Sequence, residues 1–390
     1  MCFLTPCLAS PTEFQKCLDK TPPVPFEDIR RVVEEDLGQP LSAAYESVDP
    51  VPLATASVAQ VHGAVLRGSR KRVVIKVRKP GVEDALAADL AFLAASAKVL
   101  EFLAPELGRG SVAAIAGDLR ASMLDELDFR KEAKNLGSFR AFLESSGITT
   151  CVAPFVYDAL TSTRVLTMDR LTGVPLTDLD AIARVQLAAG GSGSSPEAVL
   201  INALNTWSLS VIACDTFHAD LHAGNLLVLP DGRVGFIDFG IVGRVSPATW
   251  VAVQALLKAA AGDDWRTAAA ALVTMGAAGN DVDIDAFGRD LQALATSVAS
   301  VQATLVVDST RPGGPGVGVA VDETDITRLV LQLVRVGDAH GVKFPREFGL
   351  LLKQVLYFDR YQRALAPELD VLNDPRVQLR ASRQRGGAGW

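Results

Sequence analysis

Hydrophobic and polar positions along the chain follow two different periods. Residues 57–66 and 72–77 are rich in β-branched side chains and flank a short RGSRK link, a pattern that predicts a β-hairpin. The segment 82–104 instead repeats apolar side chains every three to four residues, which is typical of one face of a long helix. A shorter amphipathic helix is predicted over 26–37, closed by Gly38. This part of the chain should therefore combine a small sheet with helices.

Further along the chain, the same patterns predict a mostly helical region. One more helix is expected over 111–143, followed by strands near 151–156 and 164–169. After Gly240 the pattern is almost wholly helical, interrupted by a Gly/Pro-rich loop at 311–318. Together these elements predict a small α/β lobe, a linker and a larger helical lobe.

Composition agrees with a folded chain and limits its partners. Of 390 residues, 49% are hydrophobic and 21% are charged, which allows a sizeable buried core. The formal net charge of −7 disfavours broad contact with nucleic acid phosphates. The five cysteines form no CxxC pair, which predicts reduced thiols. The most apolar window, 198–214, contains two Asn and is predicted to be a buried core helix and not a membrane span.

The strongest chemical signal lies in the stretch FHADLHAGNLLVLPDGRVGFIDFG, residues 217–240. Asp220 and Asn225 have the spacing D-x-x-x-x-N, and Asp238 opens a D-F-G. Two short strands joined by a PDG turn are predicted between them. Phosphoryl transfer from ATP needs a carboxylate near the acceptor, and amide and carboxylate oxygens that hold Mg²⁺. The alternative is turn-forming aspartates, but both halves at this spacing favour phosphoryl transfer.

Such a site also needs a lysine on a strand. VVIK (73–76) has the V-A-I-K form and falls on the second strand of the predicted hairpin. Lys76 would hold the α- and β-phosphates. Arg78 lies on the same strand face by the two-residue period, so it is a rival cation.

The lysine in turn needs a glutamate on a helix. The segment LDELDFRKEAKN offers Glu126 and Glu132, with Asp128 between them. The alternative is a solvated helix face on which Glu126 and Arg130 form an i,i+4 pair.

The segment that would cover the phosphates contains no G-x-G-x-x-G. The sequence before the hairpin is PLATASVAQVHG, with small side chains at Ala54, Thr55, Ala56 and Ser57. Small residues still let backbone N–H groups approach a phosphate, but alanine adopts positive φ less readily than glycine. A stiffer nucleotide loop is therefore predicted.

Five segments in this order resemble the UbiB family, the atypical kinases also called ABC1 or AarF-domain kinases. The segments are PLATASVAQVH, VVIKVRKPGV, ELDFRKEAKN, VLTMDRLTGVPL and FHADLHAGNLL…IDFG, and the resemblance covers about residues 12–265. It implies an α+β, protein-kinase-like two-lobe fold, with a family-specific helical insert in the N-lobe and a mostly helical C-lobe. It also implies ATP and Mg²⁺ binding, and a role in prenylquinone or lipid metabolism.

The resemblance also implies roles for individual residues. Asp220, Lys76 and Glu132 would be catalytic, while Asn225 and Asp238 would hold the metal. Nucleotide contacts are implied for Ala54, Thr55, Ala56, Ser57, Lys76, Met168 and Asp169. Glu126 and Asp128 would form the family's E-x-D motif.

Lobe boundaries follow from the same resemblance. An N-terminal extension is expected over 1–48, in which the family's K-x-G-Q motif does not occur. The N-lobe, with the Ala-rich loop, the lysine strand and the inserted helices, is expected over 49–169. The helical C-lobe, with the catalytic and metal loops, would cover 170–370. A basic tail over 371–390 is predicted to be disordered.

Two departures from ordinary protein kinases argue against a protein acceptor. Ala219 replaces the arginine of H-R-D, and no A-P-E segment follows D-F-G. His222 stands where Ser/Thr kinases have a lysine on the transferred phosphate. Protonated, it could partly substitute for that lysine, and neutral it would be an ordinary loop residue; the sequence favours neither.

Three functions fit these signals. The leading one is an ATP- and Mg²⁺-dependent kinase or ATPase, an enzyme of the phosphotransferase class. The others are a small-molecule phosphotransferase and a nucleotide-gated scaffold for a membrane biosynthetic complex. Expected partners are nucleotide, a membrane surface, a quinone precursor or lipid, and a biosynthetic protein complex, but no nucleic acid. The first twenty residues resemble neither a signal nor a transit peptide. The family's many plastid members favour a plastid, with mitochondrion and bacterial cytoplasm as alternatives.

Overall fold

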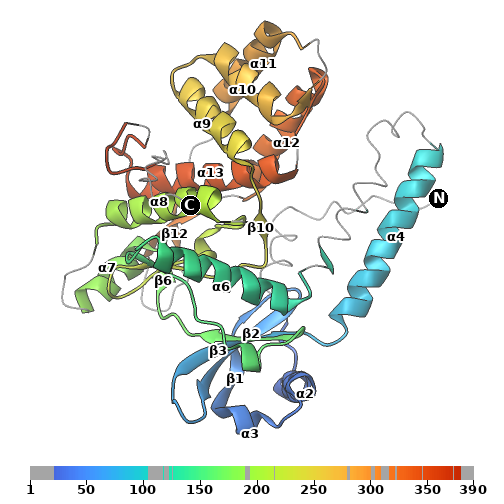
Figure 1. The fold of residues 1–390 in the computed structure, drawn as a ribbon, viewed down its shortest axis with the longest axis vertical. Coiled ribbons are helices and arrows are strands. Elements are labelled where there is room, and N and C mark those ends of the chain that lie inside the picture. The colour runs from blue at the N-terminus through green and yellow to red at the C-terminus, as the bar shows by residue number, and fades with distance from the viewer. Residues whose placement is uncertain are drawn as a thin grey trace, which may run out of the picture. The chain divides into compact units, whose positions relative to one another are not determined.

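A computed structural model divides the chain into two units (Figure 1). The first comprises Met1–Gly137 and Pro154–Arg170, and the second comprises Ser138–Ala153 and Leu171–Trp390. The residues that the structure describes are 22–103, 117, 123–124, 126–188, 194–214, 216–278, 282–299, 304–308, 316–320, 323–344, 346–371 and 373–378. Residues 1–21 of the predicted extension and residues 379–390 of the predicted tail therefore lie outside the described residues.

The first unit is built on a four-stranded antiparallel sheet. In the order in which they lie side by side, its strands are β1 (Tyr45–Thr55), β2 (Ala59–Leu66), β3 (Arg72–Arg78) and β5 (Val165–Asp169). The two β-branched runs form β2 and β3, so the predicted hairpin is confirmed. In its RGSRK link, Gly68 and Arg70 adopt positive φ, which allows the tight reversal. The predicted strand near 164–169 is also confirmed as β5.

Helix α2 (Phe26–Leu37) packs on this sheet, as the amphipathic pattern predicts. Its buried side chains share one cluster with those of β3 and β5: Ile29, Val32, Val33, Val73, Ile75, Val77 and Val165. Burying each such side chain contributes roughly 1.5–3 kcal/mol. The helix ends at Gly38, whose φ of 65° is left-handed. Helix α3 (Leu41–Ala44) follows, so the described part of the predicted extension packs within the first unit.

The helical insert is present, but one predicted helix is wrong. Helix α4 (Val82–Leu103) agrees with the predicted long helix, whereas the helix expected over 111–143 does not form as one element. Helix α6 (Phe129–Ser145) begins only after a turn at 126–128. Asp128 accepts a hydrogen bond from the Arg130 N–H at this helix start, the capping role that aspartate favours. Residues 111–116 and 118–122 lie outside the described part of the chain.

The strand predicted near 151–156 is divided between the two units. Strand β4 (Cys151–Val152) belongs to the second unit, whereas Val156 forms a β-bridge with Met168 in the first. Pro154 stands at the division and has no N–H to donate to a strand ladder, which explains why the strand does not continue.

A small sheet and a buried helix form the core of the second unit. Adjacent strands of the sheet, in order, are β4, β9 (Val234–Phe236), β8 (Leu226–Val228) and β6 (Val174–Pro175). The predicted pair of strands around the PDG turn is thereby confirmed as β8 and β9. The apolar window at 198–214 forms α8 (Pro196–Ala213), a buried core helix as predicted. Among the described helices, none combines the length and the apolar character needed to span a bilayer.

The rest of the second unit is mostly helical, as expected. Its further elements are β7 (Phe217–His218), β10 (Val242–Gly243), α7 (Leu179–Ala188), α9 (Pro247–Ala261), α10 (Trp265–Met275), α11 (Ile284–Ala299), α12 (Glu323–Ala339), α13 (Arg346–Leu365), β11 (Ala277–Ala278), β14 (Val342–Lys343), β12 (Thr304–Asp308) and β13 (Gly316–Ala320). The Gly/Pro-rich segment predicted as a loop over 311–318 is partly wrong, because β13 begins at Gly316 and pairs with β12.

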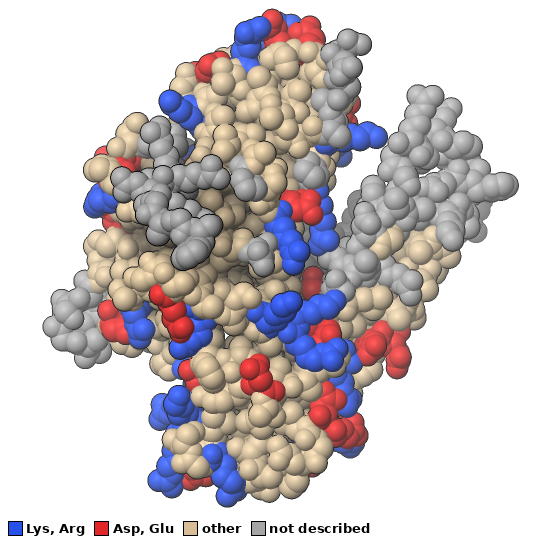
Figure 2. Space-filling model, in the orientation of Figure 1, with Lys and Arg blue, Asp and Glu red and all other residues tan. Residues whose placement is uncertain are grey.

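Charge on the described surface is mixed in sign. On the face shown in Figure 2, Lys and Arg side chains are interspersed with Asp and Glu. Ion pairs account for part of this pattern, such as Arg30 with Glu34 on α2 and Arg140 with Glu144 on α6. The described cysteines Cys151 and Cys214 are free thiols, as the composition predicts.

Candidate active site

The lysine strand and the glutamate helix meet inside the first unit. Lys76 on β3 places its Nζ 3.0 and 2.9 Å from the two carboxylate oxygens of Glu132, in the first turn of α6. Glu132 is 4% exposed, and the Lys76 ammonium also lies 5.4 Å from the centre of the Phe129 ring. An acidic residue in the first helical turn is favoured by the helix dipole. Together the buried pair and the dipole fix the direction of the lysine side chain.

Arg78, the rival cation, has other partners. Its guanidinium donates to the backbone carbonyl of Leu127 at 2.9 Å and to the Glu83 carboxylate at 2.6 Å. It therefore links the start of α4 to the turn before α6. Of Lys76 and Arg78, Lys76 is the one that bonds to Glu132.

The E-x-D motif lies in the turn that precedes α6. Asp128 binds the Arg130 guanidinium through two oxygens, at 2.9 and 2.7 Å, and this side-chain hydrogen bonding lowers the pKa of Asp128. Glu126 is half-buried in the same turn. Arg130 thus contacts Asp128, whereas the alternative from the sequence paired it with Glu126.

The Ala-rich segment is continuous with the β1–β2 hairpin. Ala54 and Thr55 end β1 opposite Val61 and Gln60, and the Ala56 N–H donates to the Ala59 carbonyl at 2.8 Å. Ala54, Ala56 and Ser57 are exposed. Residues 54–57 all have negative φ, because the described non-glycine residues with positive φ lie elsewhere. The segment therefore combines small side chains with a negative-φ backbone, and its stiffness stays a prediction.

Met168 and Asp169, for which the resemblance implies nucleotide contacts, lie at the end of β5. Met168 pairs with Val74 and is buried, and Asp169 pairs with Val73. The Asp169 carboxylate accepts a hydrogen bond from the Tyr157 hydroxyl at 2.7 Å. Burial, together with that carboxylate, raises the pKa of Tyr157 to about 12, so the phenol remains a donor. The first unit ends at Arg170, directly after this pair.

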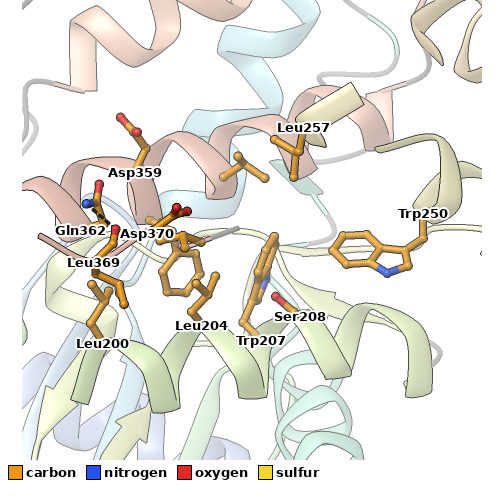
Figure 3. Close-up of a pocket in the computed structure, with 13 residues that line it drawn as sticks. Leu200, Leu204, Trp207, Ser208, Trp250, Leu257, Asp359, Gln362, Leu369 and Asp370 are labelled. Carbon is orange, nitrogen blue, oxygen red and sulfur yellow. Dashed lines mark hydrogen bonds between the residues drawn. The ribbon is translucent and has the colours of Figure 1, made fainter. Parts of the chain in front are cut away.

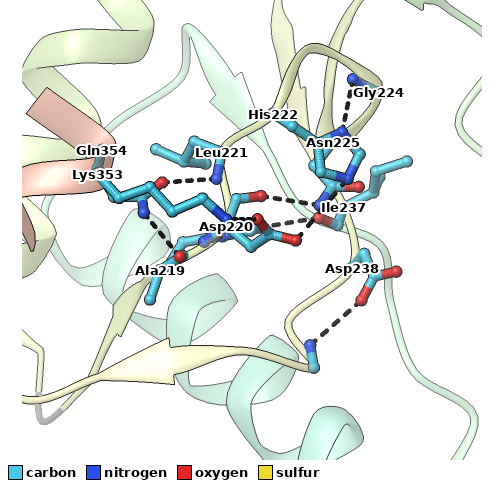
Figure 4. A network of polar contacts seen from close by, with 12 residues as sticks. Ala219, Asp220, Leu221, His222, Gly224, Asn225, Ile237, Asp238, Lys353 and Gln354 are labelled. Atoms are coloured by element: carbon cyan, nitrogen blue, oxygen red, sulfur yellow. Dashed lines mark hydrogen bonds and ion pairs between the residues drawn. The ribbon is translucent and has the colours of Figure 1, made fainter. Parts of the chain in front are cut away.

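In the second unit, the catalytic-type loop follows β7 and is tied to α13 (Figure 4). Lys353 Nζ lies 2.9 Å from the Asp220 carboxylate, and the Asp220 side chain is 22% exposed. The Gln354 amide accepts from the Leu221 N–H and donates to the Ala219 carbonyl, both at 2.7 Å. The buried side chain of Gln354 therefore holds the backbone on both sides of Asp220.

A buried histidine joins this loop to the D-F-G loop. His218 Nε2 lies 2.9 Å from the Ile237 carbonyl, and the Asp220 N–H donates to Nδ1 at 3.2 Å. A nitrogen that accepts a hydrogen bond carries no proton, so these partners assign the neutral tautomer with the proton on Nε2. Complete burial lowers the pKa of His218, which also favours the neutral form. His218 therefore acts as a fixed connector and not as a charged group.

Asn225 and Asp238 present oxygen atoms suited to Mg²⁺. The Asn225 amide nitrogen donates to the Asp220 carbonyl at 2.9 Å, which leaves its oxygen as an acceptor. Asp238 has a left-handed backbone with φ of 59°, a conformation that aspartate tolerates better than most residues. Its carboxylate accepts from the Gly240 N–H at 3.3 Å. One amide and one carboxylate fit the usual protein contribution to a magnesium site.

His222 has a local structural contact. Its Nδ1 accepts from the Gly224 N–H at 3.1 Å and caps a short 3-10 turn, Ala223–Asn225. Its Nε2 lies 3.8 Å from the Asp220 carboxylate, and the side chain is partly exposed. An imidazolium has a proton on each ring nitrogen and cannot accept a hydrogen bond, so the bond from Gly224 favours the interpretation of His222 as an ordinary loop residue.

The sequence interpretation missed the residues of α13 that contact the loop. Lys353, Gln354 and Tyr361 all bond to residues 219–221, and the Tyr361 hydroxyl donates to the Leu221 carbonyl at 2.8 Å. A signal exists in the helix, where these polar groups recur at helical spacing between buried apolar positions such as Leu351 and Phe358. Each unit thus carries a lysine–carboxylate pair, and the second unit adds oxygen ligands for a metal.

Comparisons with known proteins relate this chain to kinase-like proteins. Residues 16–272 match the family model of the ABC1 atypical kinase-like domain. The chain is 51% identical over 381 residues to an uncharacterized chloroplastic aarF domain-containing protein kinase of Arabidopsis thaliana, covering 96% of this chain and 69% of that protein. It is 31% identical over 363 residues to the probable protein kinase UbiB of Xanthomonas oryzae pv. oryzae, covering 90% of this chain and 60% of the relative.

A solved structure shares the fold. The Mycobacterium tuberculosis protein Rv3197, solved in a complex with erythromycin, matches with a TM-score of 0.52 and 22% identity. The match covers 92% of this chain and 88% of that one.

Proposed function

The chain belongs to the ABC1 atypical kinase-like family, to which its motifs already pointed, and from this premise we propose that it is an ATP- and Mg²⁺-dependent kinase or ATPase. The kinase-like α+β fold predicted from the sequence is likewise confirmed. The proposal is carried by one observation: the lysine and the catalytic aspartate required for phosphoryl transfer are both held in fixed directions. Glu132 holds Lys76, and Lys353 holds Asp220.

In the first unit, Lys76 neutralises charge on the α- and β-phosphates of ATP. Glu132 keeps the lysine directed, because both of its carboxylate oxygens accept hydrogen bonds from the Lys76 ammonium, at 3.0 and 2.9 Å. The exposed backbone of the Ala-rich loop, Ala54 to Ser57, contacts the phosphates. Met168 and Asp169 contact the adenine.

In the second unit, Asp220 orients the acceptor hydroxyl or water and accepts its proton as the γ-phosphoryl group moves to the acceptor. The amide oxygen of Asn225 and the carboxylate of Asp238 hold Mg²⁺. Bound Mg²⁺ supplies charge neutralisation on the phosphate oxygens. His218 keeps both loops in register through its two hydrogen bonds.

Lys353 completes this arrangement. Its side chain is 32% exposed, and its ammonium lies 2.9 Å from the Asp220 carboxylate. The same cation stabilises negative charge that develops beside Asp220 during transfer. In Ser/Thr kinases a lysine of the catalytic loop supplies this charge. This chain has His222 at that position, and Lys353 takes over the role of the lysine.

The acceptor we propose is water or a small lipid-like molecule of prenylquinone or lipid metabolism. The similarity to a protein named UbiB supports the metabolic role, and Ala219 in place of the H-R-D arginine argues against a protein acceptor. A membrane surface and a biosynthetic protein complex are proposed partners. The chloroplastic relative supports a plastid location.

The test measures phosphate release by the purified full chain with Mg-ATP, in buffer and with neutral lipid vesicles. Asp220→Asn should reduce release to background while nucleotide binding, measured by calorimetry, persists. Lys76→Ala and Asp238→Asn should weaken nucleotide binding itself.

Each outcome separates one candidate from another. Wild-type release no faster than that of Asp220→Asn in every condition would overturn the catalytic proposal. If nucleotide still bound, a nucleotide-gated scaffold would remain. If nucleotide did not bind at all, both would be overturned.

A further inference from the structure

Most of the buried charged side chains among the described residues lie in the first unit. They are Arg78, Lys79 and Glu132, and Arg78 is the only buried arginine in the described part of the chain. The second unit instead encloses a mainly apolar pocket of about 280 Å³ between α8, α9 and α13 (Figure 3). Arginine is almost never fully buried unless it is paired, so the partners of Arg78 indicate what its burial is for.

Arg78 and Lys76 tie the same stretch of chain to β3. The Arg78 guanidinium donates to the Leu127 carbonyl at 2.9 Å, in the turn before α6. The Lys76 ammonium bonds to Glu132 in the first turn of that helix. Residues two apart on a strand point to the same face, about 6.7 Å from each other. Two contacts at this separation fix both the position and the direction of the start of α6, whereas one contact would let the helix pivot.

The shape of the guanidinium suits both contacts at position 78. One of its terminal nitrogens donates to Leu127, and the other donates to the Glu83 carboxylate at 2.6 Å. A guanidinium is planar and presents its donors as a rigid fork, whereas a lysine ammonium is a single point charge. Leu127 is itself buried, so without Arg78 its carbonyl would lose this donor in the protein interior.

Backbone hydrogen bonds bring the same elements together. The Arg78 N–H donates to the Arg164 carbonyl at 2.9 Å, and the Phe129 N–H donates to the Thr163 carbonyl at 3.1 Å. The end of β3, the residues before β5 and the start of α6 therefore meet at one place. The Arg78 side chain also reaches α4 from there, through Glu83 in the first turn of that helix.

We propose that Arg78 is a positioning residue, which holds the start of α6 against β3 so that Glu132 meets Lys76. The inference rests on the proposed function, in which Lys76 binds the phosphates of ATP. Because the same guanidinium holds Glu83, the position of the inserted helix α4 also bears on Lys76. Arg78, the rival cation by sequence, thus acts on the nucleotide site through Glu132.

The test measures how fast Lys76 is acetylated by sulfosuccinimidyl acetate in the full chain without nucleotide, read by mass spectrometry of its peptides between pH 7 and 10. Only the neutral amine attacks the reagent, so an ammonium that bonds to a carboxylate reacts slowly. Arg78→Met should raise the rate at Lys76 about threefold at pH 8. The rate at Lys71, which is exposed in the β2–β3 link, should not change.

The pH profile separates positioning from a loosened fold. Moving Glu132 away from Lys76 should shift the profile of Lys76 acetylation to lower pH, as Glu132→Gln does directly. A fold that merely exposes Lys76 raises the rate at every pH and leaves the profile in place. Loss of the Arg78 charge by itself would shift the profile to higher pH, so the direction of the shift is decisive. Arg78→Lys, which keeps the charge but not the fork, should shift the profile less than Arg78→Met.

Double variants and matched controls complete the test. Adding Arg78→Met to Glu132→Gln should give no further increase in the acetylation rate of Lys76, because both changes act on one contact. Arg72→Met, at the exposed end of the same strand, should have no effect. Glu83→Ala should raise the rate about twofold, and Asp84→Ala, in the same turn of α4, should not. Should Arg78→Met fail to fold, Arg78→Lys and Glu83→Ala carry the test.

Two results would overturn the proposal. One is an acetylation profile of Lys76 in the Arg78 variants that matches wild type or moves to higher pH. The other is a rate increase from Arg78→Met that is as large in the Glu132→Gln background as in wild type. Since acetylation needs no ATP, either result is distinct from a failure of the proposed kinase or ATPase activity.

Discussion

The Lys76–Glu132 pair of the first unit is more deeply buried than the Lys353–Asp220 pair of the second. The partners are 56 residues apart in the first pair and 133 residues apart in the second. The first joins side chains that are 14% and 4% exposed, with both carboxylate oxygens engaged. The second joins side chains that are 32% and 22% exposed, through one carboxylate oxygen. A buried pair is costly to break, whereas a partly solvated pair contributes less to stability. The first therefore suits permanent positioning of Lys76, and the second directs Asp220 while part of its carboxylate stays open to solvent.

The largest effect is expected from breaking the buried pair. Glu132→Ala leaves the Lys76 ammonium without its carboxylate partner and should lower the free energy of unfolding by about 3–5 kcal/mol. Glu144→Ala is the matched control, because Glu144 lies on the same helix in an exposed pair with Arg140 and should cost under about 0.5 kcal/mol. Urea unfolding of the two variants measures the difference. Similar losses would remove the distinction between the pairs.

The next effect concerns the backbone that carries Asp220. Gln354→Leu leaves the Leu221 N–H and the Ala219 carbonyl unsatisfied in the interior, and should cost about 2–3 kcal/mol in unfolding free energy. Arg363→Leu, on the exposed side of the same helix, should cost about 0.5 kcal/mol or less. A Gln354→Leu variant as stable as wild type would show that the loop carrying Asp220 does not depend on this contact with α13.

Removing the exposed cation should affect rate more than stability. Lys353→Met should slow phosphate release about tenfold, which is about 1.4 kcal/mol in the barrier, with under 1 kcal/mol lost in unfolding free energy. Lys353→Arg keeps the charge and should recover part of the rate. Steady-state kinetics over a range of ATP concentrations should place the loss in kcat and not in KM. Unchanged kcat in Lys353→Met would contradict the role proposed for this lysine.

The smallest expected effect is a pH dependence from His218. Its pKa is lowered in the fold, so below about pH 6.5 the unfolded chain takes up a proton that the folded chain excludes. The free energy of unfolding should then fall with falling pH, by at most about 1.4 kcal/mol per unit for this one group. Urea titrations of wild type and His218→Gln between pH 7.5 and 5.5 measure it, with His222→Gln as the control. Equal slopes in wild type and His218→Gln would contradict the assignment.

Sequence patterns correctly predicted the helices and strand pairs that are determined by residues close together in the chain. The helix over 26–37, the β2–β3 hairpin and the β8–β9 pair around the PDG turn follow from local periodicity and turn chemistry. The family resemblance implied the contact between Lys76 and Glu132, although 56 residues separate the two. These elements carry their own signal because their side chains pack within a few residues, or because their chemistry constrains spacing.

The sequence predictions failed where the structure depends on a contact with a distant residue or on one particular side chain. The break before α6 rests on the capping contact of Asp128 and a backbone bond from Phe129 to Thr163. The strand at 151–156 divides at Pro154. Lys353 lies 133 residues from Asp220, and no local pattern states that its ammonium reaches that carboxylate.

Helix α13 has a practical consequence for defining a minimal fragment. The family match ends at residue 272, and every motif residue precedes that point, whereas α13 begins at Arg346. A protein expressed only to residue 272 would retain each recognised motif but lose Lys353, Gln354 and Tyr361, which anchor the loop that carries Asp220. Such a fragment would contain every recognised motif, but the loop that carries Asp220 would lack the contacts that support it. Fragment boundaries for this protein should therefore extend past Leu365.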